Sequence, residues 1–443
     1  MIMIKSLPVA RSVALVGVMY AGLAYAGVGD TSIGAPVLGS PLVISTSSQF
    51  AGAISSLTWR GKQFINTTDH GRELQSASSF DGLGECFNPT EAGSVTDGAS
   101  ATTTSRLLSI SASGNRLQTS IQMAFWTPAG YPYPQGCGGN PAITVAQNTT
   151  NLSNHVHSKQ ITIGFNGIPN VIEYSVNFHV PESHQSATFE AVTGYMTAEF
   201  SSFFTYDPRI GELGQISVGP GEQALPLIFS TPDRNYAMGI YSPDQPQIPG
   251  IGYGRFNFAS QGTMKWNCVY RTGATPAGDY SFNRNYIVVG TLTDVVQGMT
   301  SVSRMFFPPS ATNLVPINRF YMPSTVEHFF TANLSEGINA GFVPEGIGFY
   351  VFSASAGIPN TLPIYRCYEP ARRKHFISTA ANCEGQSVEG SYGNIYASPT
   401  SGAVALYRFF QATTGDHLET TNFSEGSSPG FTFESTLGYV PVP

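Results

Sequence analysis

The sequence predicts an all-β protein in which a large antiparallel β-sandwich precedes a smaller domain built from repeated β units. Short apolar or alternating runs recur along the chain, separated by turn residues that include 47 glycines and 30 prolines. Charged residues make up only 11% of the chain and aromatic residues 12%, which favours a packed core over disorder. At 443 residues the chain exceeds what one core supports, so we expect two or three domains.

The N-terminus has the pattern of a secretory signal peptide. Lys5 and Arg11 precede an apolar run that ends in a small-x-small cleavage site at Ala26. We therefore expect residues 1–26 to be removed and the mature protein to be secreted or periplasmic. The formal net charge of −7, without basic clusters, argues against nucleic acid as a partner, and no later segment is long enough to predict a membrane span. The oligomeric state is not indicated.

Residues 27–303 are expected to form the sandwich. Period-two alternation between turn residues is typical of β-strands. The clearest runs are Pro41–Ser45, Arg106–Ser111, Lys159–Gly164, Val171–Phe178, Tyr236–Tyr241 and Tyr286–Gly290. No window of twelve or more residues in this region keeps a convincing 3.6-residue period of apolar side chains, so we expect no long helix there. The length of the region predicts a sandwich larger than an immunoglobulin domain.

A Pro-Pro pair in residues 304–314 predicts a linker, after which residues 315–443 repeat one pattern three times. Each copy places a His nine positions after an Arg, and the three arginines are 47 and 42 residues apart. The pairs are Arg319 and His328, Arg366 and His375, and Arg408 and His417. Three coincident offsets indicate a true repeat. Three such units favour a closed pseudo-threefold domain of the β-trefoil type, because an open array leaves sheet edges exposed.

The repeated pattern R-F-Y-x-P-x-T-x-x-H-F resembles a tripled domain of unknown function that is appended to exported bacterial hydrolases, peptidases and cell-surface proteins. The resemblance covers all three copies, although the second departs from it between Pro370 and Lys374. It implies an accessory or attachment role in an exported bacterial protein. The Arg and His side chains either line glycan pockets, with Tyr321, Tyr368 and Phe410 as stacking faces, or lock each unit by hydrogen bonds. Identity across the copies favours the second interpretation.

Polar residues gather between Trp59 and Ser94, although charge is scarce elsewhere. The titratable residues there are Asp69, His70, Arg72, Glu73, Asp81, Glu85 and Glu91. Such a cluster is costly to bury, so it more often lines a wet cleft or fixes a loop than fills a core.

Two motifs resemble the galactose mutarotase-like supersandwich proteins. The run from Gly52 to Asn66, followed by a Gly-Arg pair at Arg72, is similar to their opening G-A-x-x-x-S-L-x-W-x-G and later G-R. The strand around His155 is similar to their N-H-x-aromatic strand, in which a His serves as acid or base. The resemblance implies a supersandwich fold, proton transfer by His155 and sugar binding by Arg72. His157 stands where that family has an aromatic residue, and no sugar-binding Glu is placed.

Acid–base chemistry on a sugar needs two titratable groups beside one ring. The candidates for catalysis are His155, His157, His70, Glu85 and Glu91. Glu85 and Glu91 lie in a Gly-bounded loop, and the alternative is that they cap turn amides. Glu190 and Glu222, near Gly-containing loops, are further candidates for a distant carboxylate.

Sugar rings also stack on aromatic side chains, and the Pro-rich segment from Trp126 to Cys137 suits a binding lip. The alternative is a packed loop held by Cys137. The candidates for substrate binding are Arg72, Glu73, Asn88, Trp126 and Tyr131. Arg72 is equally consistent with an ion pair to Asp69 or Glu73.

The five cysteines are disulfide candidates in an exported protein. Cys367 and Cys383 lie in one repeat, and Cys86 and Cys137 both lie in Gly/Pro-rich loops. These are the expected pairs, which leaves Cys268 as a buried thiol. We expect no metal and no cofactor, because C-x-x-C and H-x-x-x-H spacings are absent. His179 and His184 are interpreted as turn or edge residues.

The sequence therefore predicts an exported, carbohydrate-directed protein that binds a polysaccharide, sugar or cell-surface glycan through its large domain. The C-terminal domain is expected to be an accessory or attachment module. Two alternatives stay open: an enzyme, as a lyase, hydrolase or epimerase with His and carboxylate acid–base chemistry, or a non-catalytic surface or matrix binding protein. No G-x-S-x-G, phosphate-loop or H-E-x-x-H motif is present, which disfavours esterase, nucleotide-binding and metalloprotease functions.

Overall fold

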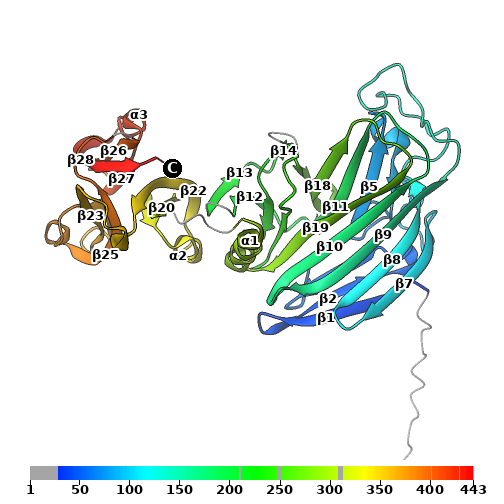
Figure 1. Cartoon of the computed structure of the whole chain (residues 1–443), viewed down its shortest axis with the longest axis horizontal. Coiled ribbons are helices and arrows are strands. Elements are labelled where there is room, and N and C mark those ends of the chain that lie inside the picture. The colour runs from blue at the N-terminus through cyan, green and yellow to red at the C-terminus, as the bar shows by residue number, and fades with distance from the viewer. Residues whose placement is uncertain are drawn as a thin grey trace, which may run out of the picture.

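The computed structural model describes residues 28–208, 211–247, 251–307, 313–400, 402–428 and 430–442. The predicted signal peptide lies outside these residues. Within them, no helix is both long enough and apolar enough to cross a membrane. The chain forms a large β-sandwich that is followed by a three-unit β region, with a helix where the two meet (Figure 1).

The first sheet of the sandwich is antiparallel throughout. In spatial order its strands are β7 (Arg106–Ser113), β8 (Arg116–Phe125), β9 (Leu152–Phe165), β10 (Ile168–Val180), β19 (Gly278–Gly290), β16 (Ala237–Tyr241), β15 (Leu227–Ser230), β12 (Ser202–Asp207) and β13 (Glu212–Ile216).

The second sheet is also antiparallel. In spatial order its strands are β1 (Thr31–Val37), β2 (Ser40–Thr46), β3 (Ile54–Trp59), β5 (Leu74–Phe80), β11 (Ala187–Thr197), β18 (Thr263–Thr272), β17 (Tyr253–Phe258) and β14 (Gly221–Gln223), with β4 (Lys62–Gln63) beside β3. The short strand β6 (Pro89–Thr90) pairs with both β5 and β8 and so joins the two sheets at one place.

The main core lies between these sheets, because alternate residues of each strand turn their apolar side chains inward. Trp59 and Trp266 are fully buried there, and each indole N–H finds an acceptor, the carbonyl of Val37 and the sulfur of Met196. The predicted all-β class and large antiparallel sandwich are confirmed. The six strand runs named from the sequence lie in strands, apart from Tyr236 at the edge of β16.

The expectation of no long helix is wrong. Helix α1 (Leu292–Phe306) follows β19, and its cap is formed by Thr291 and Asp294, each bonding the other's backbone N–H. Buried apolar residues on one face of α1 pack on β16, β10 and β19: Leu292, Val295, Val296, Met299 and Val302. The predicted linker 304–314 therefore begins inside α1, and residues 308–312 lie outside the described residues.

The C-terminal region consists of three units with the same strand order. The strands are β20 (Leu314–Met322), β21 (Glu327–Thr331), β22 (Val343–Phe352), β23 (Thr361–Glu369), β24 (Lys374–Ser378), β25 (Ser387–Tyr396), β26 (Ala403–Gln411), β27 (Asp416–Thr420) and β28 (Thr432–Pro441). In each unit the first strand pairs with the other two. Short helices α2 (Leu334–Asn339) and α3 (Phe423–Gly426) lie in the first and third units. A shared apolar core joins the units, but the β-trefoil assignment itself is not confirmed.

The sandwich and the first C-terminal unit share a second apolar cluster. Phe204 and Val302 on the sandwich side pack with Phe320, Phe329 and Phe342 of the first unit. Strand β13 also pairs with β22. Arg234 adds hydrogen bonds from one guanidinium nitrogen to the carbonyls of Ile338 and Phe342, at 3.2 and 2.6 Å. The sandwich and the repeat units are thus in direct contact.

Candidate functional site

A cleft lies on the outer face of the second sheet, over β5, β11 and β18. It consists of two adjoining hollows of about 200 and 370 Å³ that share Gly71, Glu85, Trp126 and Tyr195 in their walls. Strand parity explains the floor, because Phe189 turns into the core and its neighbour Glu190 turns outward. The predicted polar stretch therefore does contribute walls to a cleft.

The floor of the cleft holds a charged pair. Nζ of Lys265 lies 3.2 Å from Oε2 of Glu190, and the Thr193 hydroxyl donates to the same oxygen at 2.6 Å. Burial alone would raise the pKa of Glu190, but Lys265 and Thr193 hold it below its ordinary value. Burial likewise opposes the charge of Lys265, and Glu190 raises its pKa above the ordinary value. Both groups are therefore charged at neutral pH.

Aromatic faces flank this pair. Nζ of Lys265 lies 5.1 Å from the ring centre of Tyr195 and 5.2 Å from that of Phe256. Trp126 forms a wall opposite, and its ring lies so close to Gly71 that a Cβ there would come within 2.5 Å of it. The glycine therefore gives the indole its place over the cleft.

Three predicted binding residues line or border the cleft, namely Arg72, Asn88 and Trp126. Arg72 pairs with Asp69 at 2.5 Å and donates a hydrogen bond to Gln261, so the ion pair considered from the sequence is present in the wall of the cleft. Glu85 is exposed in both hollows and accepts a hydrogen bond from the Tyr133 hydroxyl at 2.8 Å. Tyr131 lies on the same loop as Tyr133 but lines neither hollow.

Both predicted disulfides are confirmed. Cys86–Cys137 ties the short 3-10 turn that carries Glu85 to the loop that carries Tyr133, and so fixes one wall of the cleft. Cys367–Cys383 closes the second C-terminal unit. Cys268 is a buried free thiol, as expected.

Three of the remaining predicted catalytic residues, His155, His157 and Glu91, line neither hollow of the cleft. His157 and Glu91 are fully buried between the sheets, with Nδ1 of His157 3.7 Å from Oε2 of Glu91. Lys159 pairs with the other carboxylate oxygen of Glu91, and the Ser76 amide donates to Oε2 at 3.0 Å. Burial lowers the pKa of His157 to about 4. Glu91 and Lys159 thus form a buried ion pair, beside which both ring nitrogens of His157 lack a hydrogen-bond partner.

His155, His70 and Glu73 are buried as well. His155 is only 2% exposed, packs against Phe80 and lies near Phe87 and Phe125, and its burial lowers its pKa to about 3. The two ring nitrogens of His70 contact the carbonyl oxygens of Gly98 and Gln49 at 2.7 and 2.8 Å, which anchors the loop. Burial raises the pKa of Glu73. His70 borders the larger hollow together with Glu85, whereas His155 and Glu73 line neither hollow.

The other sequence candidates occupy ordinary ion pairs. Glu222 pairs with Arg271 at 2.8 Å, and His179 pairs with Asp279 at 3.1 Å on the surface. Lys265, Tyr195 and Thr193 were missed by the sequence reasoning. The one available signal was Lys265, a single charge in an otherwise uncharged strand run from Met264 to Tyr270.

The repeated arginines bind the C-terminal units to one another. Each arginine pairs with a Glu of its own unit and a Glu of a neighbouring unit. The pairs to the neighbour are Arg319–Glu425, Arg366–Glu336 and Arg408–Glu384, at 2.9, 2.8 and 2.7 Å. In these pairs a glutamate of the third unit contacts the arginine of the first unit, a glutamate of the first contacts the arginine of the second, and a glutamate of the second contacts the arginine of the third. They form a closed ring, which favours the locking role for the repeat.

The histidines follow the same ring but with one link missing. His328 pairs with Asp416 at 2.6 Å and His375 with Glu327 at 2.8 Å. The equivalent partner of His417 is Lys374, whose amine instead bonds carbonyls of the first unit. Nδ1 of His417 is buried without a hydrogen-bond partner, and burial lowers its pKa to about 4. A hollow of about 210 Å³ lies beside it.

Comparisons with known proteins identify the C-terminal region only. Residues 269–392 and 316–441 each match the family described as "Domain of unknown function (DUF5648)", which covers less than half of the chain. No curated protein matches the sequence.

Solved structures align with the chain at low similarity. They include an α-galactosidase from Lactobacillus brevis (7% identity, 63% of this chain and 42% of that chain, TM-score 0.37) and an α-mannosidase from Enterococcus faecalis V583 (10%, 61% and 32%, TM-score 0.34). A candidate mutarotase from Salmonella typhimurium aligns over 59% of this chain and 91% of its own, with 9% identity and a TM-score of 0.26. The chain spans less than half of the first two proteins, and at these values the likeness carries no argument about activity.

Proposed function

We propose that the protein binds carbohydrate in the cleft over β5, β11 and β18. The observation that carries this proposal is the combination of two aromatic walls, Trp126 and Tyr195, with the fixed charged pair Glu190–Lys265 on the floor. Apolar faces of a sugar ring stack on aromatic side chains, while its hydroxyls need donors and acceptors at fixed places. Asn88 and Glu85 supply further polar groups in the walls.

The charged floor supports binding better than proton transfer. A general acid or base works best when its pKa lies near the working pH. The pKa of Glu190 is lowered and that of Lys265 is raised, so both move away from neutrality. The pair is a fixed acceptor and donor for hydroxyl groups.

One observation favours a second candidate function, the processing of the bound glycan. Glu85 is exposed in the cleft and bonded to the Tyr133 hydroxyl, so a carboxylate and a phenol lie beside the proposed sugar position. Such a pair can take up and return a proton. Glu85 is the residue on which this candidate depends.

Export is part of the proposal. Its supports are the signal-peptide pattern of residues 1–26 and the two disulfides, which form in oxidising compartments. The C-terminal units then serve as an accessory or attachment module of the exported protein.

The binding proposal is tested with the chain from Gly27 to Pro443 on an array of bacterial and plant polysaccharides, followed by calorimetry on the best ligand. Trp126→Ala should weaken binding about tenfold or more, because an aromatic stacking face of the cleft is lost. Phe307→Ala removes an exposed aromatic side chain elsewhere and should leave the affinity unchanged. Equal affinity in all three proteins, or no ligand on the array, would reject the cleft as a glycan site.

Turnover is measured in the same samples through new reducing ends and the absorbance of unsaturated products. If the protein is an enzyme, Glu85→Gln should abolish turnover and leave binding within a few-fold. Binding without turnover in the unsubstituted protein eliminates the processing candidate and leaves a glycan-binding protein.

A further inference from the structure

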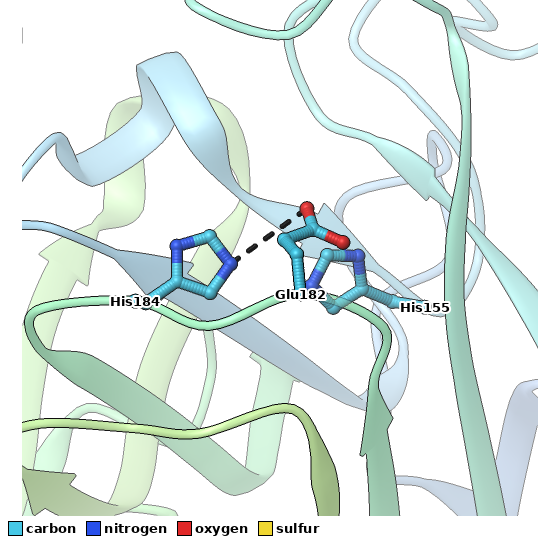
Figure 2. Close-up of side chains that lie close together, drawn as sticks. All are labelled: His155, Glu182 and His184. Atoms are coloured by element: carbon cyan, nitrogen blue, oxygen red, sulfur yellow. Dashed lines mark ion pairs between the residues drawn. The ribbon is translucent and has the colours of Figure 1, made fainter.

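Three side chains converge behind the wall of the cleft. His155 comes from β9, and Glu182 and His184 come from the connection between β10 and β11 (Figure 2). One nitrogen of each imidazole and one oxygen of the carboxylate all lie within 4.8 Å of one another. Two imidazoles and a carboxylate are a common ligand set for divalent transition metals.

The hydrogen bond that His184 makes to Asp81 leaves the lone pair of its Nε2 atom pointing toward Glu182. Nδ1 of His184 lies 2.8 Å from Oδ2 of Asp81, an acceptor, so Nδ1 carries the proton. In the neutral ring Nε2 then holds a lone pair, and it lies 3.7 Å from Oε1 of Glu182, which is also an acceptor. Two acceptors facing each other need a cation or a proton between them.

The buried nitrogens of this group lack partners. Both ring nitrogens of His155 and Nε2 of His184 are buried without a hydrogen bond. His155 is 2% exposed, so water does not satisfy it from bulk solvent. Each unpaired buried polar atom costs about 1–3 kcal/mol of folding free energy. Three such nitrogens close together are therefore unexpected unless a ligand binds them.

We propose that His155, His184 and Glu182 bind one divalent transition metal ion of the Zn²⁺ class. Asp81 then acts as the outer partner that orients His184, as carboxylates commonly do for metal-bound imidazoles. Tetrahedral zinc with bonds of about 2 Å places its ligand atoms roughly 3.3 Å apart, so the group closes by about 1–1.5 Å on binding. The Glu182 side chain is 47% exposed, so it supplies most of that movement. A solvent molecule fills the fourth position.

The backbone around the site is already fixed. His184 and Thr275 exchange two backbone hydrogen bonds of 2.8 Å, and Oδ1 of Asp81 accepts from the Gln185 amide at 2.7 Å. The His184 ring also stacks on Phe80 with ring centres 4.2 Å apart. Asp81 precedes the turn that carries Glu85, so the metal links the β10–β11 connection to one wall of the cleft.

The test uses the chain from Gly27 to Pro443 after chelator treatment and dialysis. Titration with Zn²⁺ alone should bind one ion per chain by calorimetry and elemental analysis. Co²⁺ should give the intense visible absorption of a four-coordinate site with imidazole ligands. Glu182→Gln keeps the shape of an exposed side chain and should weaken Zn²⁺ binding at least tenfold, whereas His184→Ala should abolish it.

His179→Ala is the matched control, since His179 is an exposed histidine at the end of β10, just before the connection that carries Glu182 and His184, and lies outside the group. It should bind Zn²⁺ as the unsubstituted protein does. If no stoichiometric Zn²⁺ binds, the cation between His184 and Glu182 is a proton and the proposal fails. It also fails if Glu182→Gln and His184→Ala, shown by circular dichroism to be folded, bind as tightly as the His179→Ala control.

Discussion

Glu91 and Lys159 form an ion pair with no solvent exposure of either side chain, deep between the two sheets. Taking two charges out of water is costly, and only their mutual attraction and further hydrogen bonds offset that cost. The Ser76 amide and His157 complete the surroundings of the carboxylate. The role of these residues is thus to hold the strands in register.

Replacing Lys159 with Met should destabilise the protein by about 3–5 kcal/mol, because an unpaired buried carboxylate remains. The double variant Glu91→Gln/Lys159→Met should recover most of the loss, since no charge is left in the core. Urea unfolding followed by tryptophan fluorescence measures both. A loss below about 1 kcal/mol for Lys159→Met would mean that water reaches the pair.

Glu419 provides a pH-dependent prediction. Burial raises its pKa to about 8, and it takes the position that Phe330 and Ile377 fill in the other units. An unfolded Glu titrates near 4.3. Between these values the folded protein keeps a proton that the unfolded chain has lost, so stability falls as pH rises through this window.

Glu419→Gln should remove that fall and keep the acceptor for the Ile377 amide, now at 2.8 Å from Oε1. The gain of the variant over the unsubstituted protein should be below about 1 kcal/mol at pH 4.5 and on the order of 5 kcal/mol at pH 8.5. Denaturant unfolding at the two pH values measures it. A constant difference would show that Glu419 titrates normally.

The burial of the two histidines on β9 could have been predicted from the sequence, whereas the Glu190–Lys265 pair could not. His155 and His157 share strand parity with Ile161 and Ile163, which are core residues, so alternation alone places both histidines inside. The resemblance of the His155 strand to the mutarotase-like motif implied proton transfer instead. The Glu190–Lys265 pair depends instead on the pairing of β11 with β18 across a bulge, which no local pattern encodes.

At the level of elements, the wall of the cleft is a loop pair joined by the Cys86–Cys137 disulfide. The loop from Trp126 to Cys137 is rich in proline and glycine, and few regular strand hydrogen bonds hold it. The disulfide encloses 51 residues of sequence, so loop-closure entropy predicts a stabilisation of about 4 kcal/mol.

Cys86→Ser/Cys137→Ser should therefore lower the unfolding free energy by about 2–4 kcal/mol and expose the loop to proteases. Limited proteolysis with mass spectrometry should show faster cleavage between residues 127 and 150. The matched variant Cys367→Ser/Cys383→Ser opens the C-terminal unit and should leave that loop protected. Equal cleavage in both variants would contradict the local role of the first disulfide.

Element prediction succeeded where one face of a strand is apolar and failed for α1. Its signals were present: Thr291 and Asp294 form a capping box, and Leu292, Val295 and Met299 recur at helical spacing. The Ser, Thr and Gly residues of α1 resemble the turn residues of the surrounding strands. The two cysteine pairs were predicted from the loops in which they lie and from their proximity in the sequence. Both are properties of short segments, so the sequence alone was enough to predict these pairs.

For the whole molecule, the shared cluster between the sandwich and the first repeat unit determines how the two parts unfold. Phe320, Phe329 and Phe342 cover apolar side chains of β12 and α1. Removing the first unit exposes this apolar surface to water, and each Å² exposed lowers the free energy of unfolding by roughly 25 cal/mol.

A fragment of residues 28–307 should accordingly melt several degrees below the sandwich transition of the full chain and bind a hydrophobic dye. Thermal unfolding by near-ultraviolet circular dichroism makes the comparison. Phe433→Ala in the full chain, remote from the shared cluster, serves as control and should leave the sandwich transition in place. A fragment with an unchanged melting temperature would mean that the contact adds no stability.

The closed circle of arginine–glutamate pairs has a consequence for copy number. Every unit offers one arginine to one neighbour and one glutamate to the other, so two units alone leave an unmatched end of each kind. A gene that encodes only one unit would produce a subunit that satisfies all these contacts by assembling with two further copies. Covalent tripling makes that assembly independent of protein concentration.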